Sequence, residues 1–277
     1  MVLLGDGMAD YPVAELGGKT PLQVAQTANL DRLAQRGRLG LVRTVPPGLP
    51  PGSDVANLSI FGYDPARHFS GRAPLEAAAM GVKLGPDDVA FRCNLLTLSA
   101  REGKAIMDDF SAGHISTQEA RQIIADIEKG LGTQEFNFYP GVSYRHLLVW
   151  RRGARSLSLT TTPPHDITGK PIAEYLPRGE GQEEICRLME EAQKILQNHR
   201  VNRARQESRE KQANAIWLWG QGKAPSLVPI TQRFGLEGSV ISAVDLMKGI
   251  GHYAGLEIVN VPGATGYLDT NYAGKAE

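Results

Sequence analysis

The sequence is short of the features that mark specialised protein classes. Its 277 residues include only two cysteines, Cys93 and Cys186, which lie far apart and lack the spacing of metal ligands. Cys93 falls in an apolar stretch, so buried free thiols in a reducing cytosol are expected. No apolar run approaches the roughly 18 residues of a membrane span, and no basic segment precedes a signal-type apolar core. We therefore expect a soluble, cytoplasmic protein.

The charges are balanced, which excludes a strong overall field. Lysine plus arginine and aspartate plus glutamate each total 30, so no net charge draws the protein to nucleic acid or to an anionic membrane. One basic stretch is interrupted by glutamates and lacks interleaved aromatic residues, and we interpret it as a solvated helix face: Arg200, Arg203, Arg205, Arg209 and Lys211. Neither nucleic acid nor a membrane is expected as a partner, and any recognition of phosphate must be local.

The order of elements at the start of the chain indicates an α/β protein. Residues 2–4 and 39–45 are predicted strands. Between them, Thr20 and Gln23 have the spacing of a capping box, with proline at the first helical position. A second helix is expected to end at Gly37 with a left-handed cap.

The middle of the chain is predicted to fold around its own core. Strands are expected at residues 90–98 and 144–150, and a capping box of Ser116 and Glu119 starts a helix. A long charged helix follows, with an apolar stripe at Ile185, Leu188, Met189, Ala192, Ile195 and Leu196.

From about Ala213 the pattern returns to buried strands separated by short helices, with residues 198–211 as a linker before it. One large domain or two modest ones fit the length. We predict a mostly parallel sheet interrupted by a smaller inserted domain. The three ranges are 1–74 for the first part of the core, 75–205 for the insertion and 206–277 for the second part of the core.

Two short motifs carry the functional prediction. An apolar run ends in Gly5-Asp6-Gly7, which places Asp6 at the carboxyl end of a predicted strand, where open α/β sheets bind ligands. Ser53 follows Pro50-Pro51-Gly52 and begins a predicted helix, where free backbone N–H groups favour a phosphate. A metal-binding carboxylate and a phosphate-cradled serine together suggest phosphoryl transfer through a phosphoserine, because a divalent cation could lower the pKa of the hydroxyl.

Simpler interpretations stay open for both residues. Ser53 has the sequence context of an ordinary helix N-cap, and Asp6 that of a loop carboxylate in a turn. No Gly-x-Ser-x-Gly elbow surrounds Ser53, so activation by a metal is favoured over activation by a histidine. Gly17-Gly18-Lys19-Thr20 imitates the end of a P-loop but lacks its first glycine, so no nucleotide is expected.

Three further residues are candidates for contacts with the substrate. His114 lies in a small-residue loop before a capped helix, and Lys223 follows a glycine-rich turn after a strand. Arg145 is chosen for its charge and position. A structural histidine and a surface lysine are the alternatives for the first two.

Several motifs together resemble the archaeal-type cofactor-independent phosphoglycerate mutases, over nearly the whole chain. The matching segments are Gly5-Asp6-Gly7-Met8, residues 51–65, Gly71-Arg72-Ala73-Pro74-Leu75-Glu76-Ala77, Phe91-Arg92-Cys93-Asn94-Leu95, Ser111-Ala112-Gly113-His114-Ile115, Trp219-Gly220-Gln221-Gly222 and Pro262-Gly263-Ala264-Thr265-Gly266-Tyr267. That family belongs to the alkaline phosphatase superfamily. The resemblance implies an alkaline-phosphatase-like, mostly parallel α/β core with an inserted smaller α/β domain that helps to enclose the substrate.

The resemblance also implies a reaction. Asp6 and Ser53 would bind a dinuclear Mn or Mg site, and Ser53 would take the phosphate of 3-phosphoglycerate and return it to the 2-hydroxyl after the glycerate has reoriented. Neither 2,3-bisphosphoglycerate nor a nucleotide takes part. Closure of the inserted domain would keep water from the intermediate. Such a mutase serves glycolysis and gluconeogenesis.

The family supplies most of its remaining metal ligands from Asp and His motifs that lie further along than Glu277. We therefore expect an N-terminal fragment that has little mutase activity alone. Two other functions stay open: phosphoryl transfer to another alcohol such as homoserine, and a noncatalytic truncated remnant. The identity of the metal and the oligomeric state are also left open by the sequence.

Overall fold

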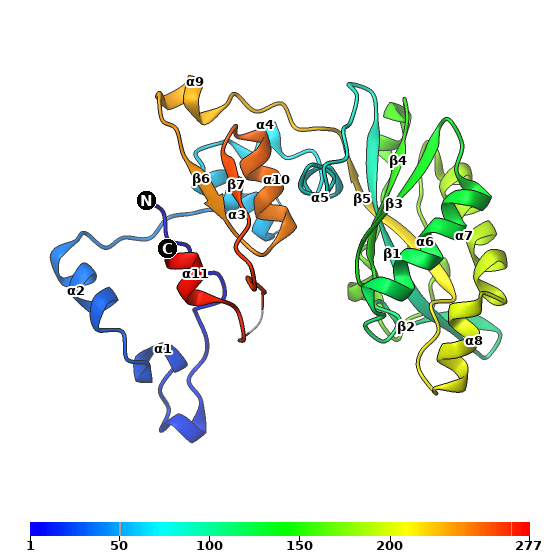
Figure 1. Cartoon of the computed structure of the whole chain (residues 1–277), viewed down its shortest axis with the longest axis horizontal. Coiled ribbons are helices and arrows are strands. Elements are labelled where there is room, and N and C mark those ends of the chain that lie inside the picture. The colour runs from blue at the N-terminus through cyan, green and yellow to red at the C-terminus, as the bar shows by residue number, and fades with distance from the viewer. Residues whose placement is uncertain (50, 267) are drawn as a thin grey trace. The chain divides into compact units, whose positions relative to one another are not determined.

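The computed structural model describes residues 1–49, 51–266 and 268–277, and its contacts separate two compact units (Figure 1). The first unit is Met1–Arg43 and the second is Thr44–Glu277. The predicted division into a core (1–74 and 206–277) and an inserted domain (75–205) differs from these two units and stays a prediction.

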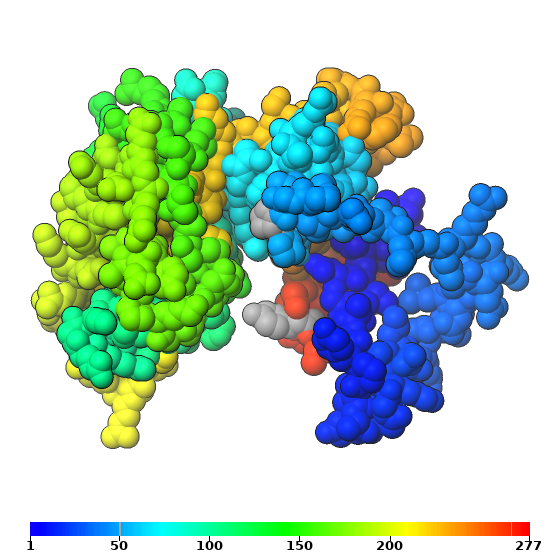
Figure 2. All heavy atoms as spheres, turned by 180° about the vertical axis from the view of Figure 1, so that it is seen from behind, coloured from blue at the N-terminus to red at the C-terminus, as the bar shows by residue number. Residues whose placement is uncertain are grey.

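The first unit contains short helices and little else. They are the 3-10 helix Ala14–Leu16, α1 (Pro21–Val24) and α2 (Ala28–Arg36). Thr20 and Gln23 form the predicted capping box in both directions, with distances of 3.3 and 2.8 Å. In Figure 2 the first unit is the connected set of spheres that runs from dark to mid-blue.

Three predictions for this part of the chain are wrong. Residues 2–4 and 39–45 form no strand. A strand needs a neighbour for its backbone and a core for one face, whereas no residue of the first unit is buried. Gly37 ends α2 in an extended conformation with φ −94°. Glycine is favoured there for a different reason, because a Cβ atom would lie 2.9 Å from the Leu33 carbonyl oxygen.

The second unit is organised around a five-stranded antiparallel sheet. β1 (Val89–Arg101) is central and pairs with β2 (Lys104–Asp109), β4 (Arg145–Trp150) and β5 (Ala215–Gly222), while β3 (Phe136–Val142) pairs with β4. The predicted strands at 90–98 and 144–150 are confirmed.

The expected mostly parallel sheet is wrong for the described residues. Their single parallel pairing joins β6 (Ser239–Ile241) to β7 (Glu257–Val259) over three residue pairs. β5, predicted as a strand of the parallel core, pairs antiparallel with β1. Its continuous apolar run indicated burial on both faces, and both faces are in fact covered. Burial alone does not distinguish a parallel from an antiparallel strand. The predicted mixture of helices and strands is confirmed, whereas the predicted parallel direction of the strands is not.

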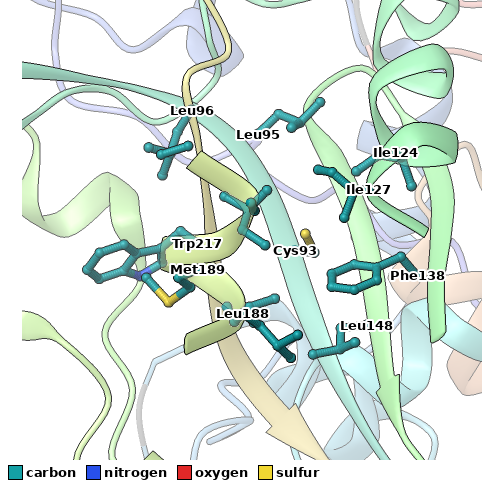
Figure 3. Close-up of a cluster of buried hydrophobic side chains, with 14 of the residues drawn as sticks. Cys93, Leu95, Leu96, Ile124, Ile127, Phe138, Leu148, Leu188, Met189 and Trp217 are labelled. Atoms are coloured by element: carbon teal, nitrogen blue, oxygen red, sulfur yellow. The ribbon is translucent and has the colours of Figure 1, made fainter. Parts of the chain in front are cut away.

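Helices cover one face of this sheet and form the main core (Figure 3). α6 (Thr117–Leu131) begins with the predicted capping box, and α7 (Gln182–Gln197) carries the predicted apolar stripe. Their side chains pack with those of β1, β3, β4 and β5, including Cys93, Leu95, Ile124, Ile127, Phe138, Leu148, Leu188 and Trp217. Both cysteines are free thiols, and Cys93 is fully buried as expected, whereas Cys186, also expected to be buried, is only half-buried.

The stretch expected as a linker is a packed helix. α8 (Arg200–Glu207) follows α7 directly, and Arg205 is 4% exposed. The interpretation of the whole basic cluster as a solvated face is therefore wrong at Arg205, because buried carbonyl and carboxylate oxygens accept hydrogen bonds from its guanidinium.

A second, smaller core is built mainly from helices. α3 (Ser53–Ile60), α5 (Ala73–Ala79) and α10 (Asp245–Tyr253) pack together. α4 (Pro65–His68) follows α3 in the chain, and Ile230 of α9 (Ile230–Phe234) packs against this core. The buried side chains are Leu58, Tyr63, Leu75, Leu246, Ile250 and Ala254. The remaining elements of the second unit are α11 (Tyr272–Ala276) and the 3-10 helices Ala154–Ser158, Pro164–Ile167 and Ala173–Tyr175.

α5 joins the two cores. Its Ala73 and Ala77 pack against Ala90 of β1 and Leu147 of β4, outside the core that α6 and α7 cover. None of the helices built from the described residues combines the length and apolar character that crossing a lipid bilayer requires.

Candidate functional site

Ser53 is the first residue of α3, as predicted. The N-cap is Gly52, in an extended conformation, so Ser53 is not itself the cap. The Nδ2 of Asn57 donates to the Ser53 carbonyl oxygen at 2.7 Å, which fixes the backbone of the first turn. Ser53 is exposed, and its hydroxyl makes no hydrogen bond within the described part of the chain. Pro50 of the preceding turn lies outside the described residues.

Asp6 belongs to the first unit, where it lies in an exposed turn. Gly7, the next residue, has φ +74°, a conformation that glycine adopts without strain. Because Asp6 and Ser53 belong to different units, a shared pocket for the two stays a prediction.

The donor set for a dinuclear metal site is incomplete in the part of the chain that the structure describes. Within residues 1–49, 51–266 and 268–277, no group of three or more His, Cys, Asp or Glu side chains lies together as metal ligands do. Two divalent ions need more ligands than one carboxylate and one hydroxyl.

Two arginines share one carboxylate of α5: Arg92 is buried and Arg72 is half-buried. Glu76 of α5 accepts from the Nε of Arg72 at 3.2 Å and, through its other oxygen, from the Nε of Arg92 at 2.9 Å. Each arginine donates to Glu76 through its Nε. Across the described residues, the Nη atoms of both guanidinium groups have no hydrogen-bond partner.

Arg92 is unusual because it lies within the buried run of β1. Only 5% of the residue is exposed, and its guanidinium stacks 4.3 Å from the ring centroid of Trp219 on β5. Burial lowers the pKa of Arg92, the charge of Glu76 raises it, and the charges of Arg72 and Arg145 lower it further. The charges of two further guanidinium groups therefore act on Arg92, which favours the binding of an anion beside it.

His114 and Arg145, both predicted substrate contacts, meet at Tyr144. The ring of His114 packs edge-on to the Tyr144 ring, with centroids 5.9 Å apart. The guanidinium of Arg145 lies 4.4 Å from the centroid of the same ring, and its Nη2 donates to the Tyr144 hydroxyl at 2.7 Å. Both His114 and Arg145 are exposed, so their remaining nitrogen atoms face solvent.

A line of rings connects this pair with Arg92. Phe110 packs against Tyr144 at 5.8 Å and against His165 at 6.0 Å, and His165 packs against Trp219 at 5.6 Å. The line of rings thus runs from Tyr144, on which Arg145 packs, to Trp219, on which Arg92 packs.

Two glycines let the segments that carry Arg72 and Lys223 cross closely. A Cβ atom on Gly71 would lie 2.1 Å from the Gln221 carbonyl oxygen, and one on Gly222 would lie 1.9 Å from the Ser70 carbonyl oxygen. The hydroxyl of Ser70 donates to the Lys223 carbonyl at 2.6 Å. The segments that carry Arg72 and Lys223 are therefore neighbours. The Nζ of Lys223 already forms an ion pair, with Asp87 at 3.4 Å.

Sequence reasoning did not select Arg72 and Arg92 as site residues. One signal was present for Arg92, since a charged residue inside an apolar strand must be paired or functional. No comparable signal marks Arg72, because the φ of +122° at the preceding Gly71 is a property of the folded chain.

Comparison with known proteins identifies relatives over the whole chain. A profile of the family described as 2,3-bisphosphoglycerate-independent phosphoglycerate mutase matches residues 34–202. A protein of Geobacter sulfurreducens named probable 2,3-bisphosphoglycerate-independent phosphoglycerate mutase is 59% identical over 99% of this chain and 68% of its own length. A mutase of the same name from Methanosarcina barkeri is 56% identical with the same coverage. The chain thus spans about two thirds of the length of these curated relatives.

Two solved structures are also similar. The PH0037 protein from Pyrococcus horikoshii matches with a TM-score of 0.74 and 29% identity, over 96% of this chain and 62% of that one. A cofactor-independent phosphoglycerate mutase from Thermoplasma acidophilum matches with a TM-score of 0.57 and 29% identity, over 93% of this chain and 68% of that one.

Proposed function

Because this chain belongs to the family of 2,3-bisphosphoglycerate-independent phosphoglycerate mutases, we propose that it carries the phosphoryl-accepting and substrate-binding part of such an isomerase. The reaction is the interconversion of 3-phosphoglycerate and 2-phosphoglycerate, in glycolysis and gluconeogenesis and in the cytoplasm. The names of the relatives favour this reaction over phosphoryl transfer to homoserine and over a noncatalytic remnant.

The observation that carries the proposal is the group of Arg72, Arg92 and Arg145. Phosphoglycerate has a phosphate and a carboxylate, and a guanidinium binds either anion through two parallel N–H groups. The unpartnered Nη atoms of Arg72 and Arg92 offer such pairs of donors. We assign His114, Arg145 and Lys223 to contacts with the same substrate. Lys223 would exchange its ion pair with Asp87 for one with the substrate.

Ser53 is the proposed acceptor of the phosphoryl group. A bond forms between its Oγ and the phosphorus as the bond from phosphorus to the 3-oxygen of the substrate breaks, and the serine proton ends on that oxygen. The glycerate then reorients, and its 2-hydroxyl takes the phosphoryl group while a proton returns to Ser53. The free hydroxyl and the tethered backbone of Ser53 support this role.

A metal requirement is part of the proposal. Two divalent ions, Mn or Mg, would lower the pKa of the serine hydroxyl and neutralise phosphoryl oxygens, with Asp6 and Ser53 each supplying one ligand. The described residues do not complete the ligand set, so we assign no other metal ligand. Neither 2,3-bisphosphoglycerate nor a nucleotide is required.

Titration calorimetry with 3-phosphoglycerate tests the binding site. We expect Arg72→Gln to weaken binding about tenfold, which corresponds to the loss of one good charged contact of roughly 1.4 kcal/mol. Arg67→Gln is the matched control, because Arg67 is exposed and its one ion pair among the described residues is with Asp64, at 3.9 Å. Equal affinities for the wild type and Arg72→Gln would contradict the assignment, as would a wild type that does not bind at millimolar concentration.

A further inference from the structure

The loop before α6 contains three consecutive residues in the left-handed conformation. Ala112, Gly113 and His114 have φ angles of +50°, +66° and +53°. Glycine adopts such angles freely, but alanine and histidine do so at a cost in free energy. A strained turn of this kind persists only where its surroundings hold it.

Arg205 of α8 is the group that holds the turn. Its Nη2 donates to the Ala112 carbonyl oxygen at 2.9 Å, and its Nη1 lies 3.1 Å from both oxygens of Glu119. Its Nε donates to the Lys211 carbonyl at 2.7 Å. The side chain is 5% exposed, so these bonds are made in a site from which water is largely excluded.

The partner Glu119 ties the same guanidinium to the start of α6. The N–H and the hydroxyl of Ser116 both donate to Glu119, at 3.1 and 2.6 Å. Arg205 thus links the strained residue Ala112 to the first turn of the helix that follows it. A lysine could not make these contacts together, because its ammonium lacks the planar fork of donors.

Two more bonds fix the loop on its other sides. The hydroxyl of Ser111 accepts from the His114 N–H at 3.2 Å. The hydroxyl of Ser143, in the hairpin that leads to Tyr144 and Arg145, donates to the Ile115 carbonyl at 2.7 Å. The turn and the hairpin are therefore fastened together at the place where the His114 ring meets the Tyr144 ring.

We propose that Arg205 is a positioning residue, which holds the left-handed turn of Ala112 to His114 so that the His114 side chain stays beside Tyr144 and Arg145. Without this clamp the backbone of His114 relaxes to a negative φ, and the direction of its side chain changes. The benefit to substrate binding rests on the proposed function, whereas the orientation of the ring does not.

The test compares Arg205→Lys with Arg203→Gln. Arg203 is on the same helix but is exposed and donates only to the Asn198 carbonyl. NMR of the isotope-labelled histidine rings, with His114 assigned from His114→Asn, reports the ring without any ligand. We expect Arg205→Lys to shift the His114 signals and to speed amide exchange at His114 and Ile115 at least tenfold. Arg203→Gln leaves both unchanged.

A second variant keeps the test valid if Arg205→Lys does not fold. Glu119→Gln retains the capping box, which accepts glutamine, but removes one of the two carboxylates that pair with Arg205, the other being Glu210 at 3.1 Å. A shift of the His114 signals in the same direction is expected. Folded Arg205→Lys or Glu119→Gln with wild-type His114 signals would overturn the proposal.

Calorimetry separates this inference from the proposed function. If the His114 ring is displaced and affinity for 3-phosphoglycerate falls severalfold, both are supported. If the ring is displaced while the wild type itself fails to bind 3-phosphoglycerate, the positioning role stands and the proposed function fails.

Discussion

The guanidinium of Arg92 lies between the indole ring of Trp219, at 4.3 Å, and the carboxylate of Glu76, at 2.9 Å. The Trp219 ring packs on the face of the guanidinium and the Glu76 carboxylate accepts from its Nε, while neither Nη atom has a hydrogen-bond partner among the described residues. An arginine held in this way is ordered before any ligand arrives, which lowers the entropic cost of binding an anion.

The first prediction concerns the carboxylate of this pair. Glu76→Gln leaves two guanidinium groups without their shared counter-charge, one of them 6% exposed at its side chain. Removing one partner of a buried ion pair is strongly destabilising, and we expect a loss of about 3 kcal/mol in the free energy of unfolding. Urea denaturation measures this loss. Glu180→Gln, at an exposed residue with no ion pair among the described residues, should change the stability by less than about 0.5 kcal/mol.

A second prediction follows from His146, which is buried on β4. Its Nδ1 accepts from the Gly141 N–H at 3.0 Å, and its Nε2 has no partner within the described residues. Burial lowers the pKa of His146 to about 3. Because the folded state resists protonation, the stability due to the neutral ring is complete above the unfolded pKa of about 6.5. It is lost as the pH falls from there towards 3.

The corresponding measurement is the unfolding free energy as a function of pH. Between pH 6 and pH 4 the wild type should lose up to about 1.4 kcal/mol per pH unit through this residue. His146→Asn keeps an acceptor for Gly141 and removes the titrating group, so its stability should fall less steeply with acid. Parallel curves for the two proteins would contradict the assignment.

A third prediction concerns the two thiols. Burial raises the pKa of both Cys93 and Cys186, but Cys93 is fully buried whereas Cys186 is partly exposed. The thiolate is the reactive form, so a disulfide reagent should modify Cys186 in the native protein and Cys93 only after unfolding. Cys186→Ser should abolish the native reaction. A fast native reaction of Cys186→Ser would show that the core around Cys93 opens.

Local signals in the sequence predicted the helices well. The capping boxes of Thr20 with Gln23 and of Ser116 with Glu119 are formed as expected, because a cap depends on residues three positions apart. The start of α3 at Ser53 was predicted from the Pro-Pro-Gly turn before it, which is also a local signal.

Features that depend on distant partners were predicted less well. The direction of β5 follows from its pairing with β1, more than a hundred residues earlier in the chain. Arg205 was interpreted as a solvated residue because its partners, Ala112 and Glu119, are far from it in sequence. The grouping of Arg72, Arg92 and Arg145 was missed likewise, since α5, β1 and β4 bring them together only in the folded chain. His114 and Arg145 were selected one by one, and their shared contact with Tyr144 was not foreseen.

The most direct test of the account is mass spectrometry of the peptide that contains Ser53, after the protein has been incubated with 3-phosphoglycerate and manganese. We predict one phosphoryl group on Ser53 in the wild type and none in Ser53→Ala. A single transfer suffices for detection, so steady-state turnover is not needed. A wild-type protein that binds 3-phosphoglycerate but acquires no phosphoserine at this residue would contradict the central claim.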